Sequence, residues 1–217
     1  MRTILKGVEP RSLTEHRQTA GANYENYQDK DTLREYLVRE QRGLCCYCMA
    51  PIRPDRHAMK IEHFHSQTSH REEQLRYSNL LGACMGGEGA SFAYQHCDTR
   101  KGDRELSRNP AGRMHQIEEL IRFHADGHIT AGWVDFDIEL NEILNLNLPF
   151  LISNRRQALD GFLDGVARRG QFSRAMLERW LQQWSGESDN GPLLPYCQVV
   201  VYWLRKRLAR SYPRYTL

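Results

Sequence analysis

Apolar residues at helical spacing predict helices near the start of the chain and through its second half. Leu33, Tyr36 and Leu37 recur three and four residues apart, so we expect a helix over about 29–42 that Gly43 ends. The second half should be mainly helical because apolar residues repeat there in the same way. Ser173 is expected to cap the third of these helices, and a final helix should cover about 196–210. The apolar stripes of the three helices are Ile138, Leu140, Ile143, Leu144 and Leu146; Leu159, Phe162, Leu163 and Val166; and Leu177, Trp180, Leu181 and Trp184.

Shorter segments between these helices predict strands. Residues 59–64 alternate between apolar and polar side chains, and residues 79–84 predict a second strand or a tight return. Asp126-Gly127 separates two short apolar runs, which predicts a hairpin after a helical start within 114–124. The polar, basic segment 96–105 is expected to form a short exposed helix.

These elements predict an α+β protein in three parts. Residues 1–28 are polar and mixed, and predict an extended arm with little structure of its own. Residues 29–110 carry the strands and the candidate chemistry. Residues 111–217 form a mainly helical region that is a candidate partner-binding surface.

Composition places the chain among ordinary globular proteins. Of its 217 residues, 40% are hydrophobic and 26% charged, with 8 Pro and 16 Gly, which argues against a disordered or fibrous protein. No apolar run reaches the roughly 20 residues of a membrane span, and the first residues lack the apolar core of a signal peptide. We therefore expect a cytoplasmic protein with no membrane partner. The net charge of +3 is compatible with a nucleic-acid partner but does not by itself indicate one.

Five of the six cysteines lie within residues 45–97. In a reducing compartment such clustering favours metal binding over disulfides. The Cys-x-x-Cys step from Cys45 to Cys48 can bring two thiolates to one ion, and Cys84 and Cys97 would complete a tetrahedral set. We therefore expect these four residues to bind a structural zinc ion.

Alternatives stay open for the other cysteines and for one histidine. Cys46 lies between the first pair and is expected to point away from the metal, while Cys197 lies in an apolar stretch typical of a buried inert thiol. His96 adjoins Cys97 and could replace it as a ligand, since histidine also binds zinc. The simplest alternative for the whole set is that the cysteines are small core residues.

An ordered set of polar residues is interleaved with these cysteines: Glu62-His63, then Asn79, then Asp98 with Lys101 three residues later. In this order the set resembles the HNH endonuclease superfamily, whose catalytic element is a ββα-metal motif that a structural zinc often pins together. The resemblance implies a small ββα-metal core with a zinc knuckle. It also implies a metal-dependent endonuclease that hydrolyses nucleic-acid phosphodiester bonds.

The resemblance implies a role for each residue of the set. His63 matches the general base, and Glu62 and Asp98 match ligands of a catalytic magnesium or manganese ion. Asn79 matches the asparagine that orients the base or steadies its loop, and Lys101 matches the lysine of the motif helix. The residue types suit this chemistry, because an imidazole with a pKa of about 6.5 can take a proton from water near neutral pH. Carboxylates hold magnesium while leaving coordination positions open to substrate.

A narrower resemblance, to the PtuB-type HNH proteins of Septu and retron anti-phage systems, covers most of the chain. The matching segments are 44–49, 61–64, 77–81, 96–98 with Lys101, 143–147 and 155–156. Such proteins act beside an ABC/SMC-like ATPase, PtuA, so the resemblance implies a defence nuclease held by an ATPase partner or in a retron complex.

The sequence departs from the family pattern at three points. Glu62 stands where aspartate is usual, Ser66 stands where proline is frequent, and twelve residues separate Cys84 from Cys97, where many relatives have two.

The main alternative function is a nonenzymatic, zinc-stabilised subunit that binds nucleic acid or serves as an adaptor. Such a subunit needs the four cysteines but not Glu62, His63 or Asp98. A structural subunit whose helical second half holds an ATPase is compatible with either function. The loop histidines near the site, including His65 and His70, are interpreted mainly as solvated residues, although His65 could contact substrate or metal.

Overall fold

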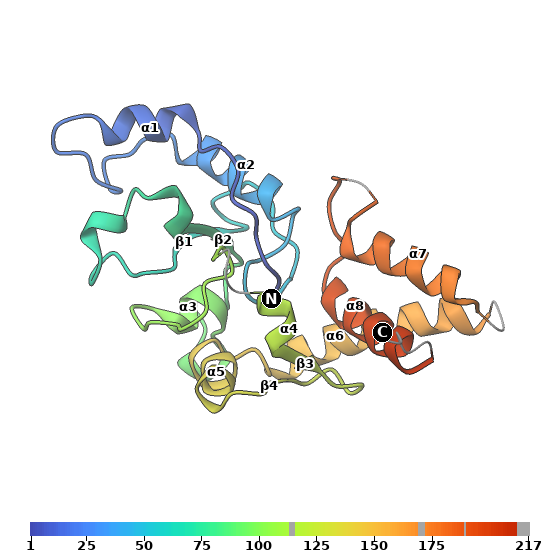
Figure 1. Cartoon of the computed structure of the whole chain (residues 1–217). Coiled ribbons are helices and arrows are strands. Elements are labelled where there is room, and N and C mark those ends of the chain that lie inside the picture. The colour runs from blue at the N-terminus through green and yellow to red at the C-terminus, as the bar shows by residue number, and fades with distance from the viewer. Residues whose placement is uncertain (113–115, 169–171, 189, 212–217) are drawn as a thin grey trace.

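The computed structural model describes residues 1–112, 116–168, 172–188 and 190–211. The α1, α2, β1, β2 and α3 elements lie on one side of the molecule, and the three long helices α6, α7 and α8 on the other (Figure 1). The helices are α1 (Arg11–Arg17), α2 (Lys30–Glu40), α3 (Cys97–Lys101), α4 (Ile117–Leu120), α5 (Val134–Ile138), α6 (Pro149–Ala167), α7 (Arg174–Ser185) and α8 (Cys197–Ser211), and the strands are β1 (Lys60–His63), β2 (Leu80–Ala83), β3 (Ile121–Phe123) and β4 (Ile129–Ala131). The prediction of a mixed α+β protein is confirmed.

The first residues are more ordered than their polar sequence indicates. Ile4 is buried, and its backbone N–H donates to the carbonyl of Pro110 at 2.8 Å. The expectation of little structure is wrong for α1, whose Leu13 is buried in a cluster with Leu33 and Leu37 of α2. Leu13 packs in this cluster with Tyr27 and with side chains of α2, and the local pattern of residues 1–28 carries no sign of the partners in α2.

The predicted helix over 29–42 is confirmed as α2, and the residue that follows it joins the helix to the first sheet. The Gln41 side chain is buried and donates to the carbonyls of Leu44 and Gly82, at 2.8 and 2.7 Å. It also accepts the backbone N–H of Gly82 at 2.6 Å. A Cβ atom at position 82 would lie 2.9 Å from Ile52 Cδ1, so glycine allows this close approach.

Each of the two sheets within the described residues is an antiparallel pair. Strands β1 and β2 pair with Glu62 opposite Leu81 and His63 opposite Leu80. Strands β3 and β4 form the predicted hairpin, and its turn includes Gly127 at φ +94°. Within the predicted helical start, Ile117–Leu120 is helical, while residues 114 and 115 lie outside the described residues.

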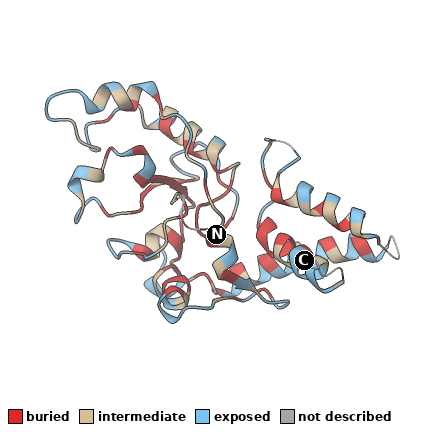
Figure 2. Ribbon diagram, viewed as in Figure 1, coloured by how far each residue is buried: buried red, intermediate tan, exposed pale blue. Residues whose placement is uncertain are grey.

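The C-terminal helices form their own apolar cluster around Phe162. Trp180 and Trp184 both pack edge-on against this ring, at centroid distances of 5.8 and 5.5 Å. Ser173 caps α7 as predicted, since its Oγ accepts the N–H of Met176 at 3.3 Å. A larger apolar cluster contains residues from both sides of position 110, so the predicted second and third parts of the chain share a core (Figure 2). No helix in the described part of the chain has the length and apolar character needed to cross a membrane.

Replacing Gln41 by alanine should lower the free energy of unfolding by about 3 kcal/mol. The substitution removes three buried hydrogen bonds and leaves polar groups of Leu44 and Gly82 without this partner. Urea denaturation at constant metal concentration measures the change. The matched control is Gln28→Ala, which removes an exposed amide and should change stability by less than about 0.5 kcal/mol. Equal stabilities for the two variants would contradict this role of Gln41.

Candidate functional site

A tight turn prepares the first two cysteines to meet one ion. The N–H of Cys45 donates to the carbonyl of Ala50 at 2.8 Å, and the N–H of Met49 donates back to the carbonyl of Cys45 at 3.2 Å. Met49 takes the left-handed conformation, with φ +66°, that closes the turn. The N–H of Ala50 also points at Cys48 Sγ, at 3.4 Å. This turn is the knuckle predicted from the Cys-x-x-Cys step.

Four sulfurs from three separate segments converge. The Sγ atoms of Cys45, Cys48, Cys84 and Cys97 all lie within 4.8 Å of one another. The Cys45–Cys97 distance is 3.9 Å and the Cys48–Cys84 distance is 3.7 Å. Tetrahedral zinc with bonds of about 2.3 Å places its sulfurs about 3.8 Å apart. This group could therefore hold a structural metal ion such as zinc.

Cys97 reaches the cluster through an unusual backbone conformation. Its φ is +53°, in the left-handed region that costs a residue with a Cβ roughly 1–2 kcal/mol. Its N–H donates to the carbonyl of Leu144 at 2.9 Å, which fixes the start of α3. The sulfur cluster gives this strained conformation a physical reason, because it places the thiol beside Cys45.

His96 and the remaining cysteines lie outside the group of four. His96 Nε2 is 3.6 Å from Cys84 Sγ, and its Nδ1 is buried with no hydrogen-bond partner, but its ring is not a member of the group. Cys46 and Cys197 are buried free thiols that also do not belong to it.

The clustered thiols cannot ionise independently. Burial opposes ionisation of Cys45, but hydrogen bonds from the surrounding thiols lower its pKa well below the usual range. Burial and the neighbouring Cys45 raise the pKa of Cys97 well above it. Without a cation, the cluster therefore favours a mixture of thiolate and thiol, and binding a metal would release the remaining protons.

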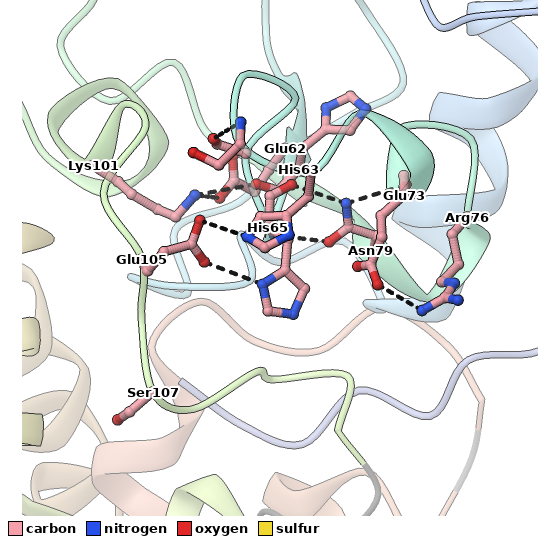
Figure 3. A network of polar contacts seen from close by, with 12 residues as sticks. Glu62, His63, His65, Glu73, Arg76, Asn79, Lys101, Glu105 and Ser107 are labelled. Carbon is pink, nitrogen blue, oxygen red and sulfur yellow. Dashed lines mark hydrogen bonds and ion pairs between the residues drawn. The ribbon is translucent and has the colours of Figure 1, made fainter.

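A second polar centre is built from β1 and α3. The prediction of an exposed helix over 96–105 is wrong for part of α3, because Cys97 and Lys101 are buried. Lys101 Nζ lies 3.0 Å from Glu62 Oε1 and donates to the carbonyl of His63 at 3.1 Å. Figure 3 shows Lys101 reaching from its helix toward Glu62. This lysine thus ties the motif helix to the strand that carries the candidate base.

The two predicted carboxylate ligands meet at this centre. Glu62 is buried, and its Oε1 accepts the hydroxyl of Tyr47 at 2.7 Å. Burial, and then the hydrogen bond to Asp98, raise the pKa of Glu62 well above its usual range. Asp98 keeps 20% of its side chain exposed and lies 3.8 Å from Lys60 Nζ. The pair offers two carboxyl groups from different elements, one of them partly exposed.

His63 is held as a neutral imidazole. Its ring packs edge-on against Tyr24 at a centroid distance of 4.4 Å, and its Nε2 lies 3.0 Å from the carbonyl of Gln74. Because a carbonyl only accepts, the Nε2 carries the proton and the Nδ1 has the free lone pair. Burial lowers the pKa of His63 to about 4. At neutral pH the ring is therefore unprotonated, and the same burial makes it a weaker base than a free imidazole.

Asn79 fixes the loop after β1. Its Oδ1 accepts the N–H of His65 at 2.8 Å, and its Nδ2 donates to the carbonyls of His65 and Glu73 at 3.0 and 3.3 Å. Figure 3 shows its amide beside the His65 backbone. Asn79 therefore steadies the loop, while the His63 ring donates its hydrogen bond to the carbonyl of Gln74.

The sequence did not identify every residue that shapes the site. Tyr24, Tyr47 and Gln74 hold His63 and Glu62, and of these Tyr24 and Gln74 stand out neither by spacing nor by type. Tyr47 alone offered a signal, because it lies inside the Cys-x-x-Cys step that positions it. No protein-family model matches this chain, and no curated protein matches it.

Cys48→Ala should remove the bound metal and lower the Tm by roughly 10 °C or more, because three sulfurs hold the ion less tightly than four. Metal retained after dialysis, together with thermal unfolding, measures both effects. Cys197→Ala removes an equally buried thiol outside the group and should keep the metal. Retention of metal by both variants, or by neither, would contradict the assignment.

Proposed function

We propose that this protein is a metal-dependent nuclease with an HNH-type ββα-metal core that hydrolyses nucleic-acid phosphodiester bonds. The observation that carries the proposal is the meeting of Glu62 and Asp98, from β1 and α3, with Asp98 within electrostatic range of His63 and with a four-cysteine group beside them in the sequence. Two carboxylates, a neutral imidazole and a rigid support are the components that this hydrolysis needs.

Each residue of the centre has a separate role in this proposal. A magnesium or manganese ion, held through Asp98 and Glu62, would stabilise negative charge on the scissile phosphate. The donor set fits such an ion, since hard cations prefer oxygen ligands and the Asp98 side chain is partly exposed. The Nδ1 of His63 accepts the proton of the attacking water. Lys101 is a positioning residue that holds β1, and Asn79 holds the following loop.

The ion in the four-cysteine group is proposed to be zinc with a purely structural role. Four sulfurs fill a tetrahedral coordination shell and leave no position for a substrate. The ion would fix the knuckle, the end of β2 and the start of α3 relative to one another.

The biological setting is proposed from the sequence resemblance. The resemblance to PtuB-type HNH proteins supports a cytoplasmic anti-phage nuclease that acts with a PtuA-like ABC/SMC-type ATPase, in a Septu or retron complex. The mainly helical region, with α6, α7 and α8, is the proposed surface for such a partner.

A nonenzymatic zinc-stabilised binding or adaptor subunit is the second candidate. The observation that favours it is the engagement of Glu62 with both Lys101 and Tyr47, together with the burial of His63. Such contacts suit a structural polar cluster as well as a catalytic one.

His63→Ala should reduce manganese-dependent cleavage of DNA or RNA by roughly 10²–10⁴-fold, because it removes the general base. The assay uses the chain alone and the chain together with a PtuA-like ABC-type ATPase, the partner that the resemblance implies. His57→Ala, which changes an exposed loop histidine, is the matched control and should cleave like the unaltered protein. Thermal unfolding verifies that both variants fold.

Two results would contradict the nuclease proposal. One is equal cleavage by the folded His63→Ala and His57→Ala variants. The other is the absence of any metal-dependent cleavage both by the chain alone and in the presence of the ATPase, which would favour the adaptor.

A further inference from the structure

A second group of metal-binding side chains lies outside the four cysteines and outside the Glu62–Asp98 pair. It consists of His65, His70 and Glu105, whose ligand atoms all lie within 4.8 Å of one another. We propose that these three residues form a second metal site, which binds a zinc-class transition ion and leaves a coordination position open to solvent.

The distances suit one ion shared by three ligands. His65 Nδ1 lies 3.1 Å from one carboxylate oxygen of Glu105, and His70 Nε2 lies 3.4 Å from the other. The two imidazole rings are 5.0 Å apart. Ligand atoms around tetrahedral zinc, with bonds of about 2.1 Å, are about 3.4 Å apart. An ion can therefore be bound with only small movements of side chains.

The first ligand is held by the scaffold of the neighbouring centre. Asn79 binds both the N–H and the carbonyl of His65, which fixes its backbone. The His65 ring also packs edge-on against the buried Phe64, at a centroid distance of 4.9 Å. Figure 3 shows His65 and Glu105 pointing toward one another. This ligand is thus oriented before any ion binds.

The second ligand is brought back toward the first by a hydrogen-bonded turn. The N–H of His70 donates to the carbonyl of Ser66 at 2.9 Å. The N–H of Ser69 donates to the hydroxyl of Ser66 at 3.2 Å, and Ser66 is buried. The turn places two histidines, five positions apart in the sequence, on the same side of the loop.

The third ligand comes from the segment after α3, which is tied to the same loop. Thr68 Oγ1 donates to Asp103 Oδ2 at 3.1 Å, two residues before Glu105. The Arg104 Nε donates to the carbonyl of Lys101 at 3.0 Å, which continues the end of the helix. An ion bound by Glu105 and both histidines would therefore cross-link the loop after β1 to the segment after α3.

The ligand types indicate which ion the site prefers. Two imidazoles favour zinc and related transition ions over magnesium, which prefers oxygen ligands. Two histidines and one glutamate are also a ligand set of zinc sites that keep a fourth position for water or substrate. The three side chains are 36–45% exposed, so an oxygen of water or of a phosphate can reach an ion bound there.

Zinc titration by calorimetry tests the proposal without relying on cleavage. The four-cysteine group is first loaded with one equivalent, and zinc is then added to the unaltered protein and to His70→Ala and Glu105→Gln. The unaltered protein should bind a second equivalent, and each variant should bind it at least about 100-fold more weakly. The control His128→Ala removes a histidine that pairs only with a carboxylate and belongs to no three-ligand group within the described residues. It should bind the second equivalent normally.

Cobalt substitution identifies the ligands of the second equivalent. A cobalt ion bound by nitrogen and oxygen should add d–d absorption without increasing the thiolate charge-transfer band. The proposal is overturned if the unaltered protein binds no second equivalent of metal, or if the His70→Ala variant binds the second equivalent as tightly as the unaltered protein does. It is also overturned if the second equivalent of cobalt increases the thiolate absorption. Retention of the first equivalent and an unchanged Tm show that the variants remain folded. Because no cleavage is measured, failure of this site is distinct from failure of the proposed nuclease.

Discussion

The convergence of four cysteine sulfurs is the constraint on which the rest of the site depends. The sulfurs come from the knuckle, from the end of β2 and from the start of α3, and hydrogen bonds such as that from the N–H of Cys46 to the carbonyl of Gly82 join the same segments. Three of the four cysteines are buried, and Cys97 adopts a strained backbone conformation to take part. A bound ion would turn this convergence into a rigid joint, whose binding energy is also folding energy.

The position of α3 relative to the four-cysteine group also sets the position of the polar centre formed by Glu62, Asp98 and Lys101. Because α3 begins at Cys97, Lys101 lies one helical turn later, where its Nζ contacts Glu62 and the carbonyl of His63. This contact is deeply buried, and a different arrangement would leave Lys101 Nζ in the interior without these partners, which is costly. The Glu62–Lys101 pair therefore specifies one register between β1 and α3.

The sequence predicted the parts of this fold that depend on local pattern. Helix α2, the β3–β4 hairpin and the Ser173 cap follow from periodicity and from turn or cap residues, and the cysteine spacing anticipated which sulfurs would meet. Helix α1 was missed because its stability comes from the contact of Leu13 with α2. The burial of Lys101 was missed because a polar, basic segment resembles an exposed helix. The contacts of Tyr24 and Gln74 with His63 depend on tertiary packing, which no local pattern encodes.

Hydrogen exchange before and after removal of the metal tests the central claim most directly. If the ion joins the knuckle, β2 and α3, chelation should increase exchange together at the amides of Cys46, Gly82 and Cys97. These amides donate to the carbonyl of Gly82, the side chain of Gln41 and the carbonyl of Leu144, respectively. Amides within α7 and α8, which pack in a separate apolar cluster, should keep their protection. Unchanged protection of Cys46, Gly82 and Cys97 in the metal-free protein would contradict the account.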